Sequence, residues 1–394
     1  MIPPSWRFYS PEGALTPGGP HKWAVIDWEL RRWFQVTGPA EALPDEEDAI
    51  KVVEQHADAV GADIHTLEVS ANGELIGVST EDPTWELRYP DYPGPLTDQE
   101  IAYRSQLTER ERLHLCTDLV EYKGCDGNSE IVAFKYTIYQ QRVEYIWREL
   151  HTLKALRDHE SFVTFRRVVL DDVSKKILGF TLQYIPGGTL EDYRENHREG
   201  PCDRPFYFSW LKQLTDAIDD LNLGFGVMHQ DIAPRNILFE PTTKGLKIFD
   251  FDRSCLIGAE DQEERRNDID GLIFTVYETF TKDDHFREVP FDEQEVQKVE
   301  DMKEWDLIVP LEEGKCIAAY RSFLADWAAA RRTTRSIKHH SEAKYPASVP
   351  PYPELVPFIK ATRFGPLKIL RRRRADVLKC GEYATCWERP SIKG

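Results

Sequence analysis

Two neighbouring stretches decide the fold of this 394-residue chain: Val227-Met-His-Gln-Asp-Ile-Ala-Pro-Arg-Asn-Ile-Leu-Phe239 and Leu246-Lys-Ile-Phe-Asp-Phe-Asp252. In the first stretch, Asp231 is followed five residues later by Asn236. In the second, a short apolar strand leads directly to Asp250. Two carboxylates and one amide therefore lie next to short apolar segments.

This pattern resembles the catalytic loop and metal-binding motif of the protein-kinase-like superfamily. The resemblance implies that Asp231 orients the attacking hydroxyl and accepts its proton, while Asn236 and Asp250 bind Mg²⁺. Mg²⁺ is a hard octahedral ion, so carboxylate and amide oxygens suit it, with waters and phosphates completing its shell. We expect His229 to pack beneath the loop. The alternative is that these Asp and Asn side chains only form local turn hydrogen bonds.

Upstream segments extend the resemblance. Val132-Ala-Phe-Lys135 resembles the strand whose lysine contacts the α and β phosphates of ATP. Glu149, fourteen residues later, is placed as the helix glutamate that pairs with this lysine; an ordinary surface ion pair worth ~0–1 kcal/mol is the alternative. The segment Gln183-Tyr184-Ile185 resembles the hinge whose backbone binds adenine. Asp268 is expected to anchor the backbone of the catalytic loop.

The resemblance narrows to a group of fungal protein-kinase-like proteins whose substrates are mostly unassigned. It rests on the motifs H-Q-D-I-A-P-R-N at 229–236 and D-F-D at 250–252, and it covers about 97–331. These motifs are specific to the superfamily but do not specify the phosphate acceptor.

The chain departs from the kinase pattern before Lys135. No G-x-G-x-x-G motif precedes it, and Gly127 lies only eight residues upstream. That leaves room for one strand rather than the usual two. We therefore expect Gly124 and Gly127 to form a hairpin turn, and the phosphates to be covered by another segment or left more exposed.

The segment after the metal motif departs as well. Only eighteen residues separate Asp250 from Asp268, which is too short for a full activation segment that docks a peptide. Gln230 replaces the arginine that would bind an activating phosphate, which argues against that switch. Asp252 replaces a glycine and is expected to stabilise the turn. Arg235 is similar to the arginine of tyrosine-kinase loops, although pairing with a nearby acid is an equal alternative.

Charge is distributed unevenly. The chain has 50 basic and 68 acidic residues, a net charge of −18. Residues 331–394 include 15 basic and 5 acidic residues, a net charge of +10, so the first 330 residues have a net charge of −28. Such an acidic body argues against nucleic acid as a partner. The cluster Arg371–Arg374 indicates either a nuclear-import or anion patch or, as the preferred interpretation, a solvated basic end.

Other features indicate a cytoplasmic protein, with the nucleus as the alternative. No apolar run reaches the ~18 residues of a membrane helix, so we expect no membrane partner. No secretory signal is recognisable at the start. The seven cysteines are scattered without zinc spacing, which indicates reduced thiols.

The predicted fold is α+β: a two-lobed protein-kinase-like fold, with a small β-rich lobe and a large helical lobe, preceded by an extra N-terminal α+β module. The predicted boundaries are 1–95 for the module, 97–185 for the small lobe, 186–331 for the helical lobe and 332–394 for a basic extension. A hairpin is expected around Asn72-Gly73, a charged helix over 97–115, and strands over 118–122 and 130–136. Further expected elements are a helix from 144, strands over 162–170 and 176–185, and helices over 189–197, 205–223, 268–281, 292–305 and 314–331.

Three functions remain open. The preferred one is an ATP- and Mg²⁺-dependent phosphotransferase, an atypical protein kinase acting on a hydroxyl acceptor. Its site residues are Lys135, Glu149, Asp231, Asn236 and Asp250, with ATP also bound through Gln183, Tyr184 and Ile185. The alternatives are a small-molecule kinase of the aminoglycoside or choline type, and a pseudokinase that acts as a scaffold.

Overall fold

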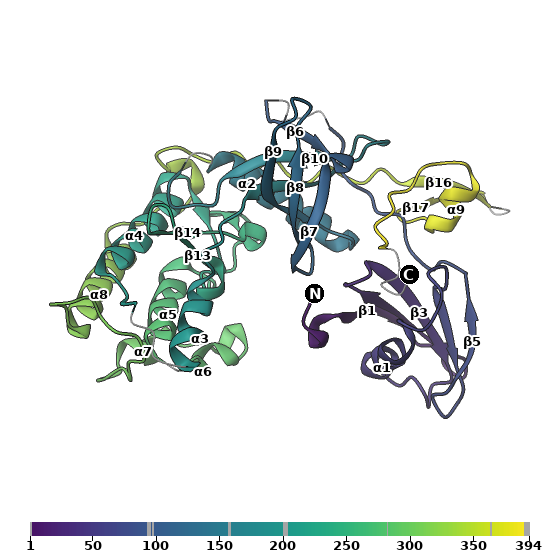
Figure 1. The fold of residues 1–394 in the computed structure, drawn as a ribbon, viewed down its shortest axis with the longest axis horizontal. Coiled ribbons are helices and arrows are strands. Elements are labelled where there is room, and N and C mark those ends of the chain that lie inside the picture. The colour runs from purple at the N-terminus through teal and green to yellow at the C-terminus, as the bar shows by residue number, and fades with distance from the viewer. Residues whose placement is uncertain are drawn as a thin grey trace. The chain divides into compact units, whose positions relative to one another are not determined.

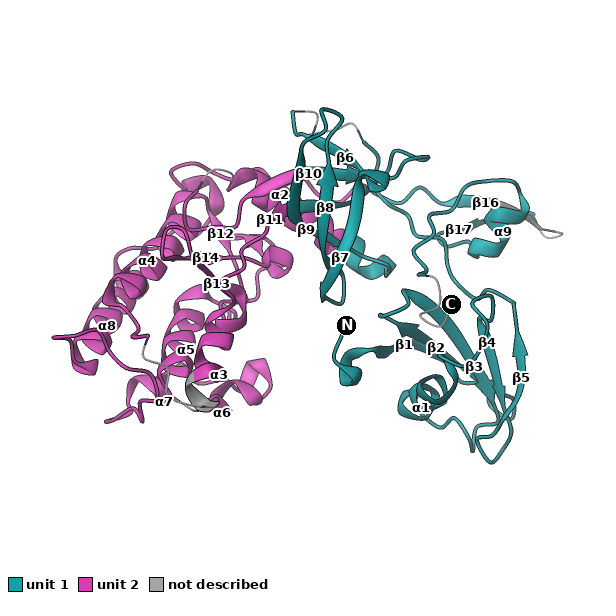
Figure 2. Ribbon diagram, viewed as in Figure 1, with its two compact units in different colours: residues 1–143, 167–181, 353–394 teal, residues 144–166, 182–352 magenta. Residues whose placement is uncertain are grey.

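The computed structural model describes residues 2–92, 96, 98–156, 159–199, 204–281, 283–362 and 365–389. The chain forms two compact units (Figure 2). Unit 1 comprises residues 1–143, 167–181 and 353–394, and unit 2 comprises residues 144–166 and 182–352. The C-terminal residues therefore share a unit with the N-terminal residues. The domain boundaries predicted from the sequence stay a prediction.

The N-terminal part of unit 1 is a five-stranded sheet with the order β1-β2-β3-β4-β5 and one helix, α1 (Figure 1). Its core contains fully buried apolar residues from β2, β3 and β4, among them Val25, Phe34 and Leu67. The helix starts after Asp45, whose side chain accepts a hydrogen bond from the backbone N–H of Asp48. The bounds are β1 Phe8–Ala14, β2 His21–Asp27, β3 Arg32–Gly38, α1 Glu46–His56, β4 Thr66–Val69 and β5 Leu75–Ser79. The predicted α+β composition and the β4–β5 hairpin are confirmed.

A second sheet of six strands has the order β6-β10-β11-β9-β8-β7. The bounds are β6 Ile101–Tyr103, β7 Leu107–His114, β8 Thr117–Lys123, β9 Ser129–Tyr136, β10 Phe165–Leu170 and β11 Ile177–Gln183. Strands β8 and β9 form a regular antiparallel hairpin from Thr117 paired with Lys135 to Lys123 paired with Ser129. Gly127 in the connecting turn has a φ of 84°, a conformation that favours glycine. The predicted hairpin turn at Gly124–Gly127 is confirmed.

The charged helix predicted over 97–115 is wrong. Within its described residues this segment forms β6, a short 3-10 turn and β7. The charges of β7 bind partners in unit 1: Arg110 pairs with Glu121, and Arg112 lies 2.5 Å from Asp118. Pairing with β8 and these ion pairs outweigh the helix propensity of the sequence, which is a local preference only.

The Arg371–Arg374 cluster is half-buried rather than freely solvated. Each arginine of the 371–374 cluster contacts the N-terminal part of unit 1. Arg372 pairs with Glu86 at 2.9 Å, and the guanidinium groups of Arg371 and Arg373 lie over the ring of Trp85 at 4.5 and 3.9 Å. A backbone bridge joins Trp85 to Arg373. Acids of the N-terminal part of unit 1 therefore pair with Arg372 and Arg374, while the other two arginines lie on Trp85. The elements of this segment are β16 Phe358–Thr362, β17 Gly365–Ile369 and α9 Arg374–Lys379.

Unit 2 is mostly helical, as predicted. Its elements are α2 Val143–Ala155, α3 Leu190–Glu199, α4 Phe208–Asp219, α5 Asp268–Phe280, α6 His285–Glu288, α7 Val296–Glu300 and α8 Ile317–Thr333, with short strands β12 Val227–Met228, β13 Ile237–Glu240, β14 Gly245–Ile248 and β15 Cys255–Leu256. The helix predicted over 292–305 is wrong in length, because only α7 forms. The chain leaves the helix and buries Trp305, whose ring lies 5.2 Å from that of Tyr277.

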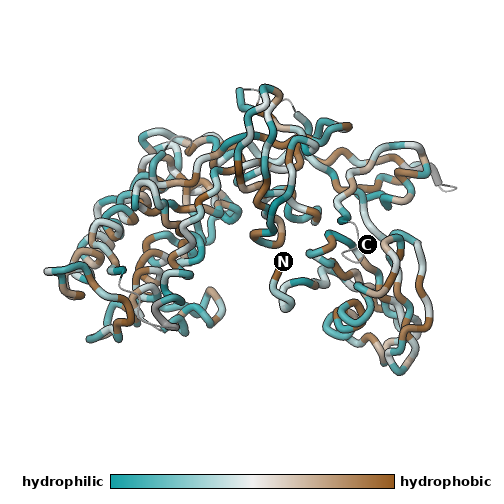
Figure 3. Tube along the Cα trace, in the orientation of Figure 1, coloured by the Kyte–Doolittle hydropathy of each residue, from teal (hydrophilic) through white to brown (hydrophobic). Residues whose placement is uncertain are grey.

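Hydrophobic residues are distributed over both units rather than gathered in one long stretch (Figure 3). Among the helices in the described part of the chain, none is long and apolar enough to cross a bilayer. Every cysteine in the described ranges is a free thiol, whereas Cys202 lies outside those ranges. Residues 390–394, the end of the predicted basic extension, also lie outside them.

Candidate active site

The loop 229–236, which we name the catalytic loop, is anchored by Asp268 at the start of α5. The Asp268 carboxylate accepts hydrogen bonds of 2.8 Å from the backbone N–H groups of His229 and Gln230. It also accepts a hydrogen bond of 2.8 Å from the side-chain amide of Asn222. Because Asp268 is buried, these donors satisfy a charge that would otherwise be costly. The predicted position of Asp268 is confirmed.

Asp231 and Asn236 are in direct contact. The Asn236 side-chain amide donates to the Asp231 backbone carbonyl at 2.8 Å and to its carboxylate at 3.0 Å. Arg235 donates to the other carboxylate oxygen of Asp231 at 2.6 Å. Since the Asn236 nitrogen is bound to Asp231, its Oδ1 points elsewhere, and no described residue donates a hydrogen bond to it. This leaves an amide oxygen that could serve as a metal ligand.

His229 packs beneath the loop, as predicted. Its side chain is fully buried. Nδ1 accepts the backbone N–H of Asp231 at 3.3 Å, so Nε2 carries the proton and donates to the Phe249 carbonyl at 2.9 Å. The imidazole therefore links the catalytic loop to the end of β14 and has no free nitrogen for proton transfer.

Asp250 follows β14 in a left-handed conformation, with φ 65° and ψ 64°. The next residue, Phe251, is fully buried and contacts the His229 ring at 4.7 Å. Its backbone N–H donates to the Glu149 carboxylate at 3.1 Å. Glu149, on α2, thus binds the backbone immediately after Asp250. The sequence did not indicate this contact.

Gln230 occupies the position of the expected arginine and joins two parts of the segment after Asp250. Its side-chain amide donates to the Arg253 carbonyl at 2.9 Å and accepts the Glu263 backbone N–H at 2.7 Å. Its own backbone has a φ of 64°, an uncommon value for a residue with a Cβ. A neutral side chain therefore makes the contacts that fix this segment.

The hinge segment Gln183-Tyr184-Ile185 follows β11. The Gln183 backbone N–H donates to the Thr164 carbonyl at 2.9 Å. Ile185 is 4% exposed, and the backbone hydrogen bonds of the described residues include none from its N–H. Buried N–H groups rarely lack an acceptor. Farther along, a Cβ at Gly187 would overlap the Phe239 carbonyl oxygen, so glycine is required where the chain crosses β13.

Lys135 lies on β9 in unit 1, half-buried and in register with Thr117. Two strands, β8 and β9, separate it from the tight turn at Leu115–Cys116. This is the separation expected for a phosphate-covering loop, yet the turn contains no glycine. Arg112 stabilises the turn by donating to the Leu115 carbonyl at 3.2 Å. A short turn without glycine, between β7 and β8, therefore stands where the phosphate-covering loop of a protein kinase would be expected.

Residues 120–289 match the family model of the protein kinase domain. The chain carries a protein-kinase-like domain. Its α+β fold, with a sheet-rich lobe and a helical lobe, agrees with this match. The use of ATP and Mg²⁺ is typical of protein kinase domains.

Curated relatives are serine/threonine kinases by name. The chain is 32% identical over 133 residues to CBL-interacting serine/threonine-protein kinase 16 of Arabidopsis thaliana, which covers 34% of this chain and 27% of that protein. It is 30% identical over 129 residues to serine/threonine-protein kinase PKH2 of Saccharomyces cerevisiae. The match covers 33% of this chain and 11% of that protein. It is 36% identical over 107 residues to serine/threonine-protein kinase ppk34 of Schizosaccharomyces pombe. The match covers 27% of this chain and 29% of that protein. The chain therefore matches less than a third of each of these relatives.

Sequence reasoning missed Arg287 and Glu278 of the kinase-like domain. Arg287 donates to the Ile232 carbonyl of the catalytic loop at 2.8 Å and to the Gly271 carbonyl at 2.6 Å. Its Nε lies 2.8 Å from the Glu278 carboxylate. Burial raises the pKa of Glu278 to about 7, although the charge of Arg287 opposes this shift. Arg287 belongs to none of the sequence motifs described above, so its contact with the catalytic loop is visible only in the folded structure.

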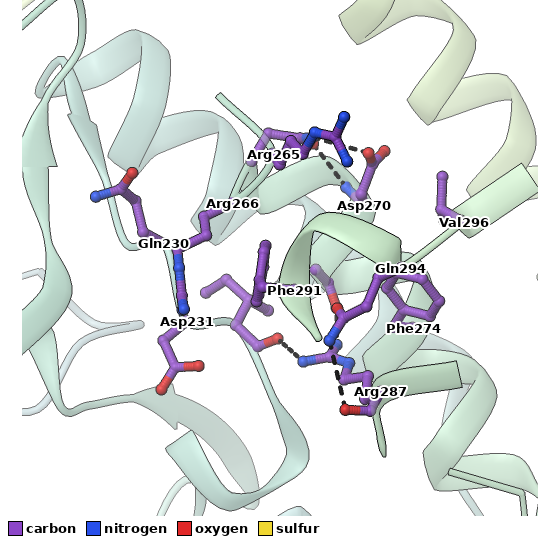
Figure 4. Close-up of a pocket in the computed structure, with 13 residues that line it drawn as sticks. Gln230, Asp231, Arg265, Arg266, Asp270, Phe274, Arg287, Phe291, Gln294 and Val296 are labelled. Atoms are coloured by element: carbon purple, nitrogen blue, oxygen red, sulfur yellow. Dashed lines mark hydrogen bonds between the residues drawn. The ribbon is translucent and has the colours of Figure 1, made fainter. Parts of the chain in front are cut away.

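An open pocket lies beside Asp231 in unit 2 (Figure 4). Its apolar lining comes from Ile232, Phe274, Phe291 and Val296, and its charged lining from Asp231, Asp270, Arg265, Arg266 and Arg287. The guanidinium of Arg266 lies 3.9 Å over the Phe291 ring. The pocket thus combines an apolar surface with both signs of charge next to the Asp231 carboxylate.

Proposed function

We propose that this chain is an ATP- and Mg²⁺-dependent phosphotransferase, an atypical protein kinase that transfers the γ-phosphate of ATP to a hydroxyl group. The observation that carries the proposal is the Asp231 carboxylate, held by Asn236 at 3.0 Å and by Arg235 at 2.6 Å. Both contacts fix the direction of a carboxylate that is still partly accessible to a substrate. A fixed, ionised carboxylate is suited to orient a hydroxyl and accept its proton.

Asn236 and Asp250 are the proposed Mg²⁺ ligands. The amide nitrogen of Asn236 is committed to Asp231, so its oxygen is the atom that would bind the ion. Within the described ranges, no group of three His, Cys, Asp or Glu side chains could hold a metal alone. This fits Mg²⁺, which usually binds one or two protein carboxylates together with substrate phosphates. When bound, the ion would neutralise charge on the phosphates.

The remaining proposed roles concern the nucleotide. The buried Ile185 N–H would donate to the adenine edge, with Gln183 and Tyr184 on the same hinge. Lys135 would bind the α and β phosphates, and Glu149 would pair with Lys135. The contact from Glu149 to the Phe251 N–H supports a position for Glu149 close to the metal motif. The acceptor is proposed to be a protein hydroxyl, because the curated relatives are named protein kinases.

The test is phosphate release and transfer from Mg-ATP by the wild-type protein and by Asp231→Asn. We expect the variant to lose about 10²–10⁴-fold in rate while it stays folded, because Asn keeps the shape but cannot accept the proton. Asp261→Asn is the matched control, since Asp261 is an exposed acid that contacts Arg148 at 3.0 Å. Equal turnover by wild type and Asp231→Asn would overturn the proposal. Parallel assays with protein and small hydroxyl acceptors separate a protein kinase from a small-molecule kinase.

A second candidate function is a scaffold without catalysis, as in pseudokinases. It is supported by the glycine-free turn at Leu115–Cys116, which offers no flexible backbone to cover phosphates. Thermal unfolding with and without Mg-ATP distinguishes the two. A ligand at 100 times its Kd adds ~2.7 kcal/mol of stability. An unchanged unfolding temperature at millimolar Mg-ATP would favour the scaffold.

A further inference from the structure

The Tyr136 ring is enclosed by side chains from the two distant ends of unit 1. On one face, the Trp387 ring stacks at a centroid distance of 4.5 Å and an interplanar angle of 10°. Over the same Tyr136 ring lies the guanidinium of Arg31, at 4.9 Å from its centroid. Tyr136 is 1% exposed and Trp387 is 4% exposed. The contact is therefore part of a buried core rather than a loose surface association.

Trp387 is held in place by polar contacts. Its Nε1–H donates to the Tyr89 hydroxyl at 2.8 Å, and that hydroxyl donates to the Thr137 carbonyl at 2.6 Å. Arg104 lies 4.1 Å over the Trp387 ring and donates to the Cys386 carbonyl at 2.5 Å. The indole therefore has one defined orientation against β9.

Arg31 is fixed independently of Trp387. It pairs with Asp118 of β8 and, at 2.9 Å, with Glu109 of β7. Asp118 is buried and lies opposite Phe134 of β9 in the sheet register. Buried ion pairs of this kind hold a defined geometry because separating the charges is costly. Arg31 from the N-terminal part of unit 1 and Trp387 from the C-terminal segment thus both contact Tyr136 of β9.

Lys135 is the immediate neighbour of Tyr136 on β9. Side chains alternate along a strand, so Lys135 is on the face opposite to Tyr136 and Phe134. The backbone here is closely packed: a Cβ at Gly179 of β11 would overlap the Lys135 carbonyl oxygen. Tyr136 and Lys135 are consecutive residues of this closely packed strand, so the packing of Tyr136 bears on the position of Lys135.

We propose that Trp387 is a positioning residue for Lys135, acting through Tyr136. This inference rests on the proposed function, in which Lys135 binds the phosphates of ATP. The short turn at Leu115–Cys116 provides no glycine-rich cover, so nucleotide affinity depends more on the placement of the lysine. The segment 383–389 and the N-terminal part of unit 1 supply that placement from the far face of the sheet.

The test measures the Kd of Mg-ATP for full-length wild type, Trp387→Ala, Trp387→Phe and Trp85→Ala. Kd is the decisive readout because partial unfolding lowers the number of binding sites but not their affinity. We expect Trp387→Ala to weaken binding about tenfold, within the range for coupled neighbours. Trp387→Phe retains a ring and should restore the Kd to within about twofold. Trp85→Ala is the matched control, because Trp85 contacts tail arginines but not Tyr136, and it should keep the wild-type Kd.

A wild-type Kd in folded Trp387→Ala would overturn the inference and leave the proposed function intact. A weakened Kd in Trp85→Ala equal to that of Trp387→Ala would also overturn it, since any damage to the tail would then suffice. If Trp387→Ala does not fold, Tyr89→Phe decides, because it removes only the hydroxyl that orients the indole. Weaker binding by Tyr89→Phe supports the inference, and an unchanged Kd overturns it. No binding by wild type would overturn the proposed function, and this inference with it.

Discussion

The Asp268 carboxylate accepts the backbone N–H of Gln230 at 2.8 Å, directly before Asp231 in the chain. Gln230 has a φ of 64°, so its backbone needs external support. Asp268 also binds His229 and Asn222. One buried acid on α5 therefore holds the backbone at the start of the catalytic loop.

Replacing Asp268 by Ala should destabilise the protein by roughly 3 kcal/mol or more, because it leaves three buried donors without an acceptor. Chemical denaturation of wild type and variant measures the difference. Asp270→Ala is the control from the same helix; Asp270 is half-buried and pairs with Arg332 at 2.7 Å. It should cost below about 1 kcal/mol. Similar losses in both variants would show that Asp268 is not a special anchor.

Gln230→Ala should loosen the segment after Asp250. The variant frees the Glu263 N–H and the Arg253 carbonyl, which the Gln230 side chain binds in the wild type. Hydrogen exchange should become faster at the Glu263 amide, while the amide of Leu272 in α5 remains protected as an internal reference. Unchanged exchange at Glu263 would mean that other contacts hold the segment.

Gly187→Ala should destabilise unit 2 by about 1–3 kcal/mol, the typical cost of overpacking. The added methyl group would overlap the Phe239 carbonyl oxygen. Gly224→Ala is the matched control, because a Cβ there meets only ordinary contacts with Asp220 at 3.8 Å. It should change stability by less than about 0.5 kcal/mol. Comparable unfolding midpoints for both variants would contradict the close crossing of hinge and β13.

Stability should decrease as the pH falls from 6.5 to 4 because of His151. Burial, with a smaller contribution from Lys154, lowers the pKa of His151 from 6.5 to about 4. Between these values the unfolded chain binds a proton that the folded chain does not, so acid favours unfolding. His151→Phe should lose this part of the pH dependence, as measured by denaturation at several pH values. Parallel curves for the two proteins would show that His151 is not the group responsible.

Local sequence patterns predicted much of unit 2. The contact between Asp231 and Asn236 lies within one short segment of the sequence. The contact of Asp268 with the catalytic loop spans 38 residues and is implied by the resemblance to the kinase family rather than by a local pattern. In unit 1, the strands over 118–122 and 130–136 are also predictable from local sequence. Apolar and polar residues alternate along them, and a glycine-containing turn joins them into a hairpin. Contacts between residues that lie close together in the sequence can therefore be predicted from the local sequence pattern.

Long-range contacts could not be predicted in the same way. The segment 107–114 has helix-forming charges but becomes β7, because β8 supplies backbone partners and countercharges. The sequence around Arg371–Arg374 favours a solvated end, since nothing nearby in the chain indicates that Glu86 and Trp85 contact these arginines. The roles of Arg287 and Trp387 likewise depend on residues far away in the chain.

The packing of Trp387 on Tyr136 has a consequence for protein synthesis. A ribosome adds about 5–20 residues per second, so β9 waits roughly 10–50 s for its last covering side chain. During that interval unit 2, residues 144–166 and 182–352, is already translated and free to fold. Throughout that interval the Tyr136 ring lacks the indole that stacks on it in the complete protein.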